Sequence, residues 1–149
     1  MTIPAADALF PTVRLLTVIS ATAAVLLVLW TVVKLGGIVD EAVYRGVVLG
    51  LMAATGSHIL GTFFGAYLSA SPADAGKPAR SLMAAYLGST TVRFLATPAL
   101  ALSLYFLLPQ KPAPLLLGAA TGHLLIMVAD VAALLRFVQG SARSSAPNA

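Results

Sequence analysis

The chain alternates between long apolar segments and short polar connections. The four apolar segments are residues 15–35, 47–68, 82–108 and 115–138. Each is long enough to cross the hydrocarbon layer of a bilayer, which takes about 20 residues of α-helix. The pattern predicts an all-α integral membrane protein: a four-helix bundle with short loops over residues 1–138, followed by a disordered tail over 139–149.

Individual residues predict how these helices begin, bend and end. Asp40 is a candidate N-cap for an earlier start of the second helix, and Glu41 would then sit at the positive end of the helix dipole. The third segment exceeds the hydrocarbon thickness, so we expect it to tilt, or to bend at Pro98. The connection 109–114 holds three prolines, and this density predicts that it is not helical.

Composition and charge agree with a membrane location. Of the 149 residues, 59% are hydrophobic and 9% are charged, against about 25% charged in an average soluble domain. The net charge of +4 comes from residues near helix ends, which favours membrane orientation over nucleic-acid binding. The side of the termini would hold five basic residues and the other side three, which predicts cytoplasmic termini: Arg14, Lys77, Arg80, Arg136 and Arg143 against Lys34, Arg45 and Lys111.

The second segment carries a row of small residues on one helical face. Their spacings are four, four, three, four and four: Gly46, Gly50, Ala54, Ser57, Gly61 and Gly65. The fourth segment repeats the device with Gly118 and Gly122. Small residues let helix backbones approach closely in lipid. The row therefore predicts helix packing within the bundle or, alternatively, a docking surface for another membrane protein.

The second and fourth segments also share a tetrapeptide. Ala53-Ala54-Thr55-Gly56 is followed by Ser57-His58, and Ala119-Ala120-Thr121-Gly122 is followed by His123. The match suggests two repeated helical hairpins, although chance similarity between Ala- and Gly-rich helices is a competing explanation.

Ionisable residues lie deep within three segments. Counted from the ends nearest the termini, Arg93 lies about 16 Å deep, His58 about 15 Å and Asp130 about 12 Å. Because an unpaired charge in hydrocarbon costs about 2.5 kcal/mol or more, we expect an Arg93–Asp130 ion pair with His58 nearby. Three interpretations of the pair stay open. It fixes helix register, it takes part in ion or proton handling, or it contacts a charged group on a partner.

The same residues argue against enzymatic chemistry. His123 lies about 22 Å deep, about 7 Å beyond His58, which disfavours two axial ligands to one haem. The chain has no cysteine, no HExxH or GxSxG motif and no phosphate-binding loop. We therefore expect a non-enzymatic protein that needs no cofactor and no metal.

The chain resembles the ATP synthase protein I family of small membrane proteins. The likeness covers about Leu15–Val138, and it is closest at Gly46–Leu68 and in SLMAAYLGSTTVRFLATPAL, where Arg93 stands for the family's third-helix basic residue. The resemblance implies an accessory protein of the bacterial inner membrane that assists assembly or stability of a rotary ATP synthase, with rotor subunits as partners. A small proton or divalent-cation transporter, working as a homo-oligomer through Arg93, Asp130 and His58, is the alternative.

Overall fold

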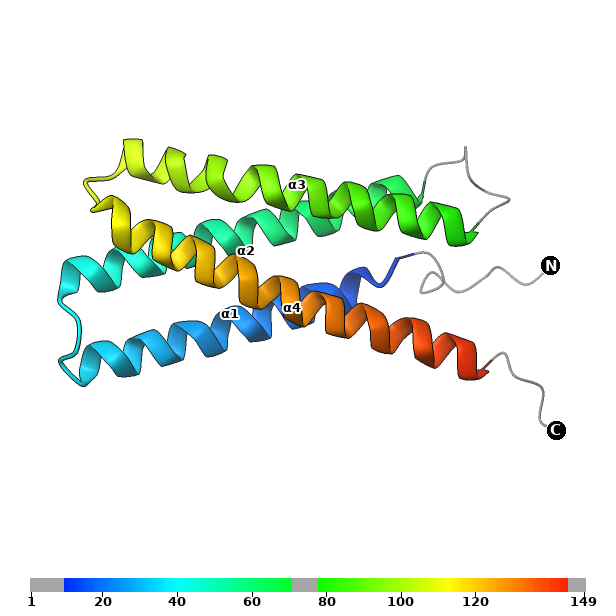
Figure 1. The fold of residues 1–149 in the computed structure, drawn as a ribbon, viewed down its shortest axis with the longest axis horizontal. Helices are drawn as coiled ribbons and strands as arrows, with labels where there is room; N and C mark the ends of the chain where they lie inside the picture. The colour runs from blue at the N-terminus through cyan, green and yellow to red at the C-terminus, as the bar shows by residue number, and fades with distance from the viewer. Residues whose placement is uncertain (1–9, 71–77, 145–149) are drawn as a thin grey trace.

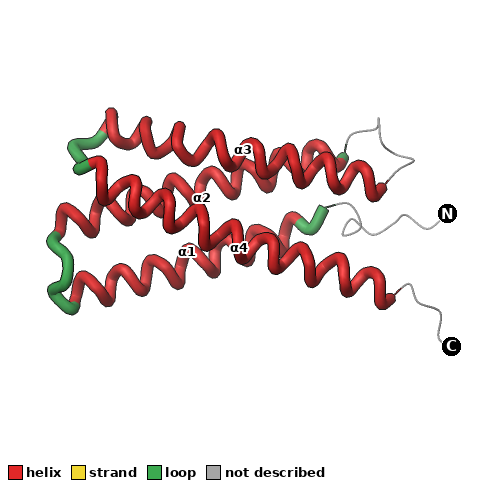
Figure 2. The backbone as a smooth tube through the Cα atoms, viewed as in Figure 1, coloured by secondary structure: helices red, strands yellow, loops and turns green. Residues whose placement is uncertain are grey.

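The residues described by the computed structural model, 10–70 and 78–144, form four helices and no strand. These are α1 (Thr12–Leu35), α2 (Glu41–Ser69), α3 (Pro78–Leu107) and α4 (Pro112–Ser144). They run alternately in opposite directions, so that both described chain ends lie at one end of the bundle (Figure 1). The tube drawing shows how short the two described connections are (Figure 2). The predicted all-α four-helix fold is confirmed.

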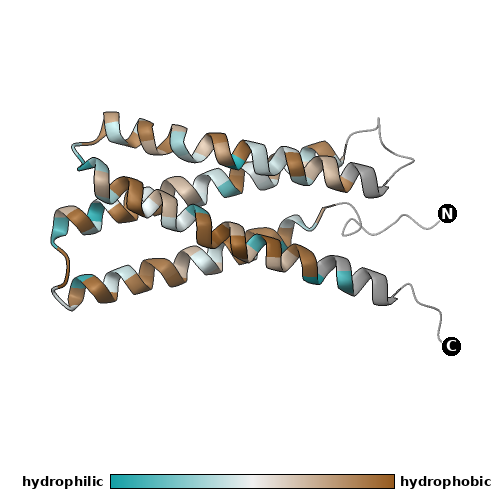
Figure 3. Ribbon diagram, in the orientation of Figure 1, coloured by the Kyte–Doolittle hydropathy of each residue, from teal (hydrophilic) through white to brown (hydrophobic). Residues whose placement is uncertain are grey.

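All four helices are long and apolar enough to cross a membrane. The candidate spans are Thr12–Leu35, Glu41–Ser69, Leu82–Leu107 and Pro112–Arg136. Apolar residues run along the whole length of the bundle (Figure 3), and many large ones point outward, including Val32, Leu95 and Phe106. A soluble monomer rarely exposes so continuous an apolar surface, so these outer faces suit contact with membrane lipid.

Two helix starts follow from side-chain chemistry. Asp40 caps α2 as expected, because its carboxylate accepts a hydrogen bond from the Val43 amide at 2.7 Å. The prediction that residues 109–114 are not helical is wrong for its second half, since α4 begins at Pro112. The first-turn amides of a helix have no acceptor within the helix, so Pro112 and Pro114 cost it no hydrogen bond.

The predicted disordered tail also begins too early. Helix α4 continues to Ser144, so residues 139–144 are helical, and residues 145–149 lie outside the described part of the chain. A single glycine at 140 costs a helix only about 1 kcal/mol, which its neighbours can offset. The polar composition of this stretch was therefore a poor guide to its backbone.

Helix α2 is the centre of the bundle. It packs along both α3 and α4, whereas α3 and α4 touch each other much less and α1 lies against α2 and α4. Helices α2 and α4 run in the same direction (Figure 1), as repeated hairpins would require, but the duplication itself stays a prediction. The buried polar side chains of α2, α3 and α4 lie where α3 and α4 both meet α2.

Candidate functional site

Buried polar side chains from three helices gather in one region of the bundle, which we call the polar column. Its members are Ser57, His58 and Thr62 on α2, Ser89, Arg93 and Thr97 on α3, and His123 and Asp130 on α4. On α3 the column extends over two helical turns, from Ser89 to Thr97, or about 12 Å. Most members are almost fully buried; His123 is partly exposed.

An ion pair joins α3 to α4 at the middle of the column. Arg93 Nη1 donates to Asp130 Oδ2 at 2.5 Å, and Arg93 Nη2 donates to Thr62 Oγ1 at 2.9 Å. Arg93 is 2% exposed and Asp130 is fully buried. The expected pairing of these two residues is present, and it includes a hydroxyl partner from α2 that compensates part of the desolvation cost.

His58 completes this charged centre. Its Nδ1 lies 3.2 Å from Asp130 Oδ2, the same oxygen that Arg93 contacts. A carboxylate can only accept, so Nδ1 carries the hydrogen and, in the neutral ring, Nε2 is left as an acceptor. Asp130 thus sets the tautomer of His58 while it neutralises Arg93.

A second group of hydrogen bonds lies one turn further along α3. Thr97 Oγ1 is 2.6 Å from Ser57 Oγ and 2.9 Å from His123 Nδ1, and it donates to the Arg93 carbonyl at 2.8 Å. These contacts connect α2, α3 and α4 at a single level. His123 is therefore anchored through Nδ1, as His58 is.

The two histidine rings join the two groups. Their centroids lie 5.0 Å apart, with the ring planes tilted by 56°. The depth estimate placed these residues at levels about 7 Å apart, but it measured backbone rise alone. Side chains extend along a helix as well as outward, so rings on parallel helices can meet from different levels.

Five buried polar atoms of the described residues have no hydrogen-bond partner. All five belong to the polar column: His58 Nε2, His123 Nε2, Arg93 Nε, Asp130 Oδ1 and Ser89 Oγ. Buried polar atoms in native proteins are nearly always paired, so a group of exceptions at one place calls for an explanation. All five lie on buried side chains of the same three helices, so the interior of the bundle holds free donors and free acceptors.

Glycines of the small-residue row create the space for this site. A Cβ added to Gly61 would overlap Arg93 Cγ and lie 2.8 Å from the Ser89 carbonyl. Toward the other end of the row, a Cβ added to Gly50 would overlap the Leu115 carbonyl. On the facing helix α4, a Cβ added to Gly118 would overlap the Val47 carbonyl. Close approach of α2 to both neighbours therefore depends on these positions.

The whole row is turned inward. Gly46 lies against Pro114, Gly65 lies against Phe10 and Ser89, and Ala54 and Ser57 are fully buried. On the facing helix α4, Gly122 lies against Ala54 and Leu51. Small residues pack the bundle itself, and no part of the row faces outward. The alternative of a partner-docking surface on this row is wrong, because helices of the same chain already cover it.

Apolar layers close the column at both ends. One turn beyond Ser57, Thr97 and His123, three alanines pack together: Ala53, Ala101 and Ala119. Beyond the opposite end lies a second cluster of Phe10, Leu15, Ala85 and Ala133. The polar column is occluded from both ends of the bundle.

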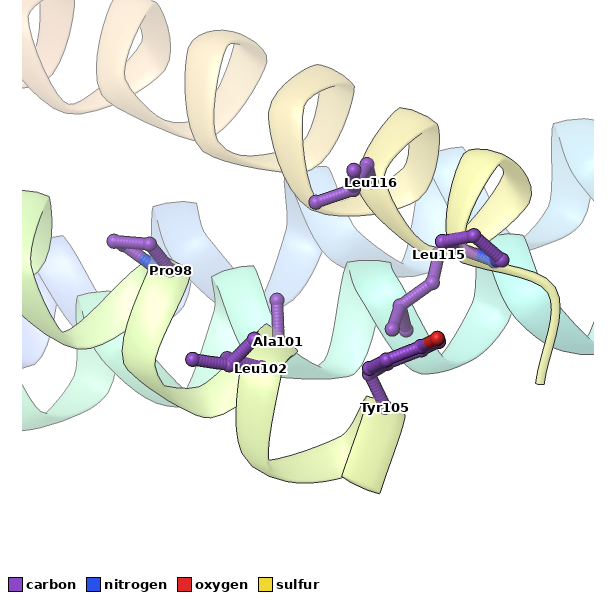
Figure 4. A pocket seen from close by; sticks show the side chains of 7 residues that line it. Pro98, Ala101, Leu102, Tyr105, Leu115 and Leu116 are labelled. Carbon is purple, nitrogen blue, oxygen red and sulfur yellow. The ribbon is translucent and has the colours of Figure 1, made fainter. Parts of the chain in front are cut away.

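A separate groove between α3 and α4 is lined by no charged side chain and no histidine. It has a volume of about 400 Å³ and lies near the connection between these helices (Figure 4). Its lining is almost wholly apolar: Pro98, Ala101, Leu102, Tyr105, Pro112, Leu115 and Leu116. Within the described residues, no group of three or more His, Cys, Asp or Glu side chains could hold a metal ion.

Sequence reasoning identified the charged members of the column but not all their partners. Thr62 was not singled out, although it lies one turn from His58 on the same helical face, which is the signal that could have found it. Phe10 carried no such signal, because it precedes α1. Comparisons with models of known protein families, with curated proteins and with solved structures gave no match.

Proposed function

We propose that this chain is a small membrane protein that moves protons through the polar column. One observation carries the proposal: two neighbouring histidines each have Nδ1 anchored by a hydrogen bond and a buried Nε2 without a partner. An imidazole can accept a proton at one nitrogen and release one from the other, and chains of Asp and His serve as proton relays in membranes.

The charges of the site favour a proton over a divalent cation. Calcium and magnesium need several oxygen ligands, usually with more than one carboxylate. Here one carboxylate, Asp130, is already neutralised by Arg93, whose own charge would repel a metal ion. A proton needs only a free lone pair, which His58 Nε2 and Asp130 Oδ1 both offer.

The occluded column suits a controlled pathway rather than an open pore. Alanines close one end and the Phe10 cluster closes the other, so neither end leaks in this conformation. Proton movement then requires one end to open at a time, with the histidine pair holding the proton between the two events.

Proton flux in proteoliposomes tests the proposal. A potassium diffusion potential should drive proton uptake, reported by a pH-sensitive dye trapped inside, at a rate well above that of protein-free liposomes. His58→Asn keeps an N–H that can donate to Asp130 but removes the imidazole and its free Nε2, so we expect flux to fall at least tenfold. Thr91→Ala is the matched control, because Thr91 is exposed and bonds only to its own helix. Wild-type flux at the protein-free level, or unchanged flux in His58→Asn, would refute the proposal.

The resemblance to ATP synthase protein I supports a second candidate, an accessory role in assembly or stability of a rotary ATP synthase. The observation that favours it is the basic residue of the third helix, Arg93, with its counter-charge supplied by Asp130 on α4. The partner would meet the outward faces of the helices, where Phe94 and Leu95 are exposed, and not the buried small-residue row.

Co-purification from native membranes separates the two candidates. An accessory protein should bring rotor subunits with it in mild detergent, and His58→Asn should leave that recovery unchanged because His58 is fully buried. Purified protein that carries no rotor subunit would refute the accessory role. The proposal of proton movement would then be decided by the flux assay alone.

A further inference from the structure

Phe10 fills a hollow that the membrane-spanning helices leave open. It lies just before α1 and outside any helix, yet it is only 5% exposed. On its inner side the ring meets small residues, Gly65 on α2, Ala85 on α3 and Ala133 on α4, and larger apolar side chains such as Leu68 and Leu82 pack against the same cluster. A large ring from outside the helices therefore completes the core.

The tip of this ring points toward the end of the polar column. A Cβ built on Gly65 would lie 2.7 Å from Phe10 Cζ and 3.1 Å from Ser89 Cβ, so ring and serine flank the same glycine. Ser89 is the last member of the column at this end, and its hydroxyl is one of the five unpartnered atoms. Phe10 thus lies between Ser89 and the end of the bundle where the termini lie.

The ring is held by packing more than by backbone structure. The Phe10 carbonyl accepts hydrogen bonds from the Thr12 amide at 2.7 Å and the Thr12 hydroxyl at 3.3 Å, and α1 begins only after Pro11. The ring can leave its hollow by rotation about its own side-chain bonds without breaking a hydrogen bond of any helix. Its other contacts are apolar packing contacts within its cluster.

We infer that Phe10 is the plug at the terminal end of the polar column and controls access from that side. The inference rests on the proposed movement of protons through the column. With the ring in place, Ser89 and Arg93 are sealed from this end. With the ring displaced, the hollow beside Gly65 joins them to solvent.

Cysteine accessibility tests the plug without any measurement of flux, because the chain has no cysteine of its own. Ser89→Cys reports the plugged end, and Ala101→Cys, in the alanine layer, reports the opposite end. We would measure the labelling rate of each cysteine by a charged methanethiosulfonate reagent on the purified protein. Combining Phe10→Ala with Ser89→Cys should raise that rate at least tenfold, whereas Phe10→Ala should leave labelling at position 101 unchanged.

Two further variants keep the test decisive. Phe10→Leu refills most of the hollow and should restore slow labelling of Ser89→Cys. Val13→Ala changes an exposed neighbour and should have no effect. Equal labelling of Ser89→Cys with and without Phe10→Ala, or faster labelling at both ends as in general loosening, would overturn the inference. Absence of proton flux with plug-dependent labelling would instead count against the proposed function alone.

Discussion

Removing one charge of the Arg93–Asp130 pair should destabilise the bundle far more than removing both. Arg93→Met takes away the 2.5 Å contact to Asp130 and the 2.9 Å contact to Thr62, and it leaves a fully buried carboxylate with only His58 as partner. Asp130→Asn leaves the Arg93 guanidinium buried without a counter-charge. Breaking a buried ion pair from one side costs about 3–5 kcal/mol of unfolding free energy.

The double variant should recover much of that loss. Arg93→Met with Asp130→Asn buries no charge, and the asparagine oxygen still accepts from His58 Nδ1. Replacement of a buried pair by uncharged side chains is often close to neutral. We therefore expect the double variant to be clearly more stable than either single variant, although simple addition would predict a loss of about 6–10 kcal/mol.

Equilibrium unfolding in mixed micelles measures this cycle. The fraction of SDS is raised and the fluorescence of Trp30, the single tryptophan, follows the transition. Thr91→Ala serves as the control for a polar change outside the column and should shift the midpoint little. Additive losses in the double variant would refute the reasoning, because they would mean that the two charges do not compensate each other.

Two more predictions concern helix packing and capping. Gly50→Ala should lower the unfolding free energy by about 1–3 kcal/mol, because the new methyl group overlaps the backbone of α4. Gly56→Ala should raise it by about 0.5–1 kcal/mol, because the only atom within 4 Å of the new methyl group is Leu100 Cδ1, at 3.6 Å. The same micelle titration compares the two, and equal effects would contradict the close α2–α4 approach. Asp40→Ala should lower the unfolding free energy by about 1 kcal/mol, because it removes the acceptor for the Val43 amide. Asp40→Asn keeps an acceptor oxygen and should recover most of that loss. An unchanged unfolding midpoint in Asp40→Ala would show that the cap contributes nothing.

Much of the fold was predictable because hydrocarbon leaves so few choices. A backbone without water must satisfy its own hydrogen bonds, so apolar length alone indicated four helices. Helix ends were less predictable: the prolines at 112 and 114 read as breakers but occupy first-turn positions, and Ser144 extends α4 beyond the expected limit.

The candidate site was predictable where charge forced a partner. Arg93 and Asp130 had few ways to be buried, and the structure pairs them. The hydrogen bond from Arg93 to Thr62 and the approach of the histidine rings depend on rotamers and helix rotation, which periodicity does not encode. The role of the small-residue row depended on whether neighbouring helices cover it, and only the packed bundle decides that.

The ion pair also has a consequence for how the chain enters the membrane. Arg93 and Asp130 are separated by 37 positions along the chain. At about 5–20 residues per second, the ribosome delivers the carboxylate roughly 2–7 s after the guanidinium. During that interval the cation on the third helix has no counter-charge, so we expect this helix to wait beside the insertion machinery or to stay shallow in the bilayer. We expect its insertion to be completed only when the fourth helix is synthesised.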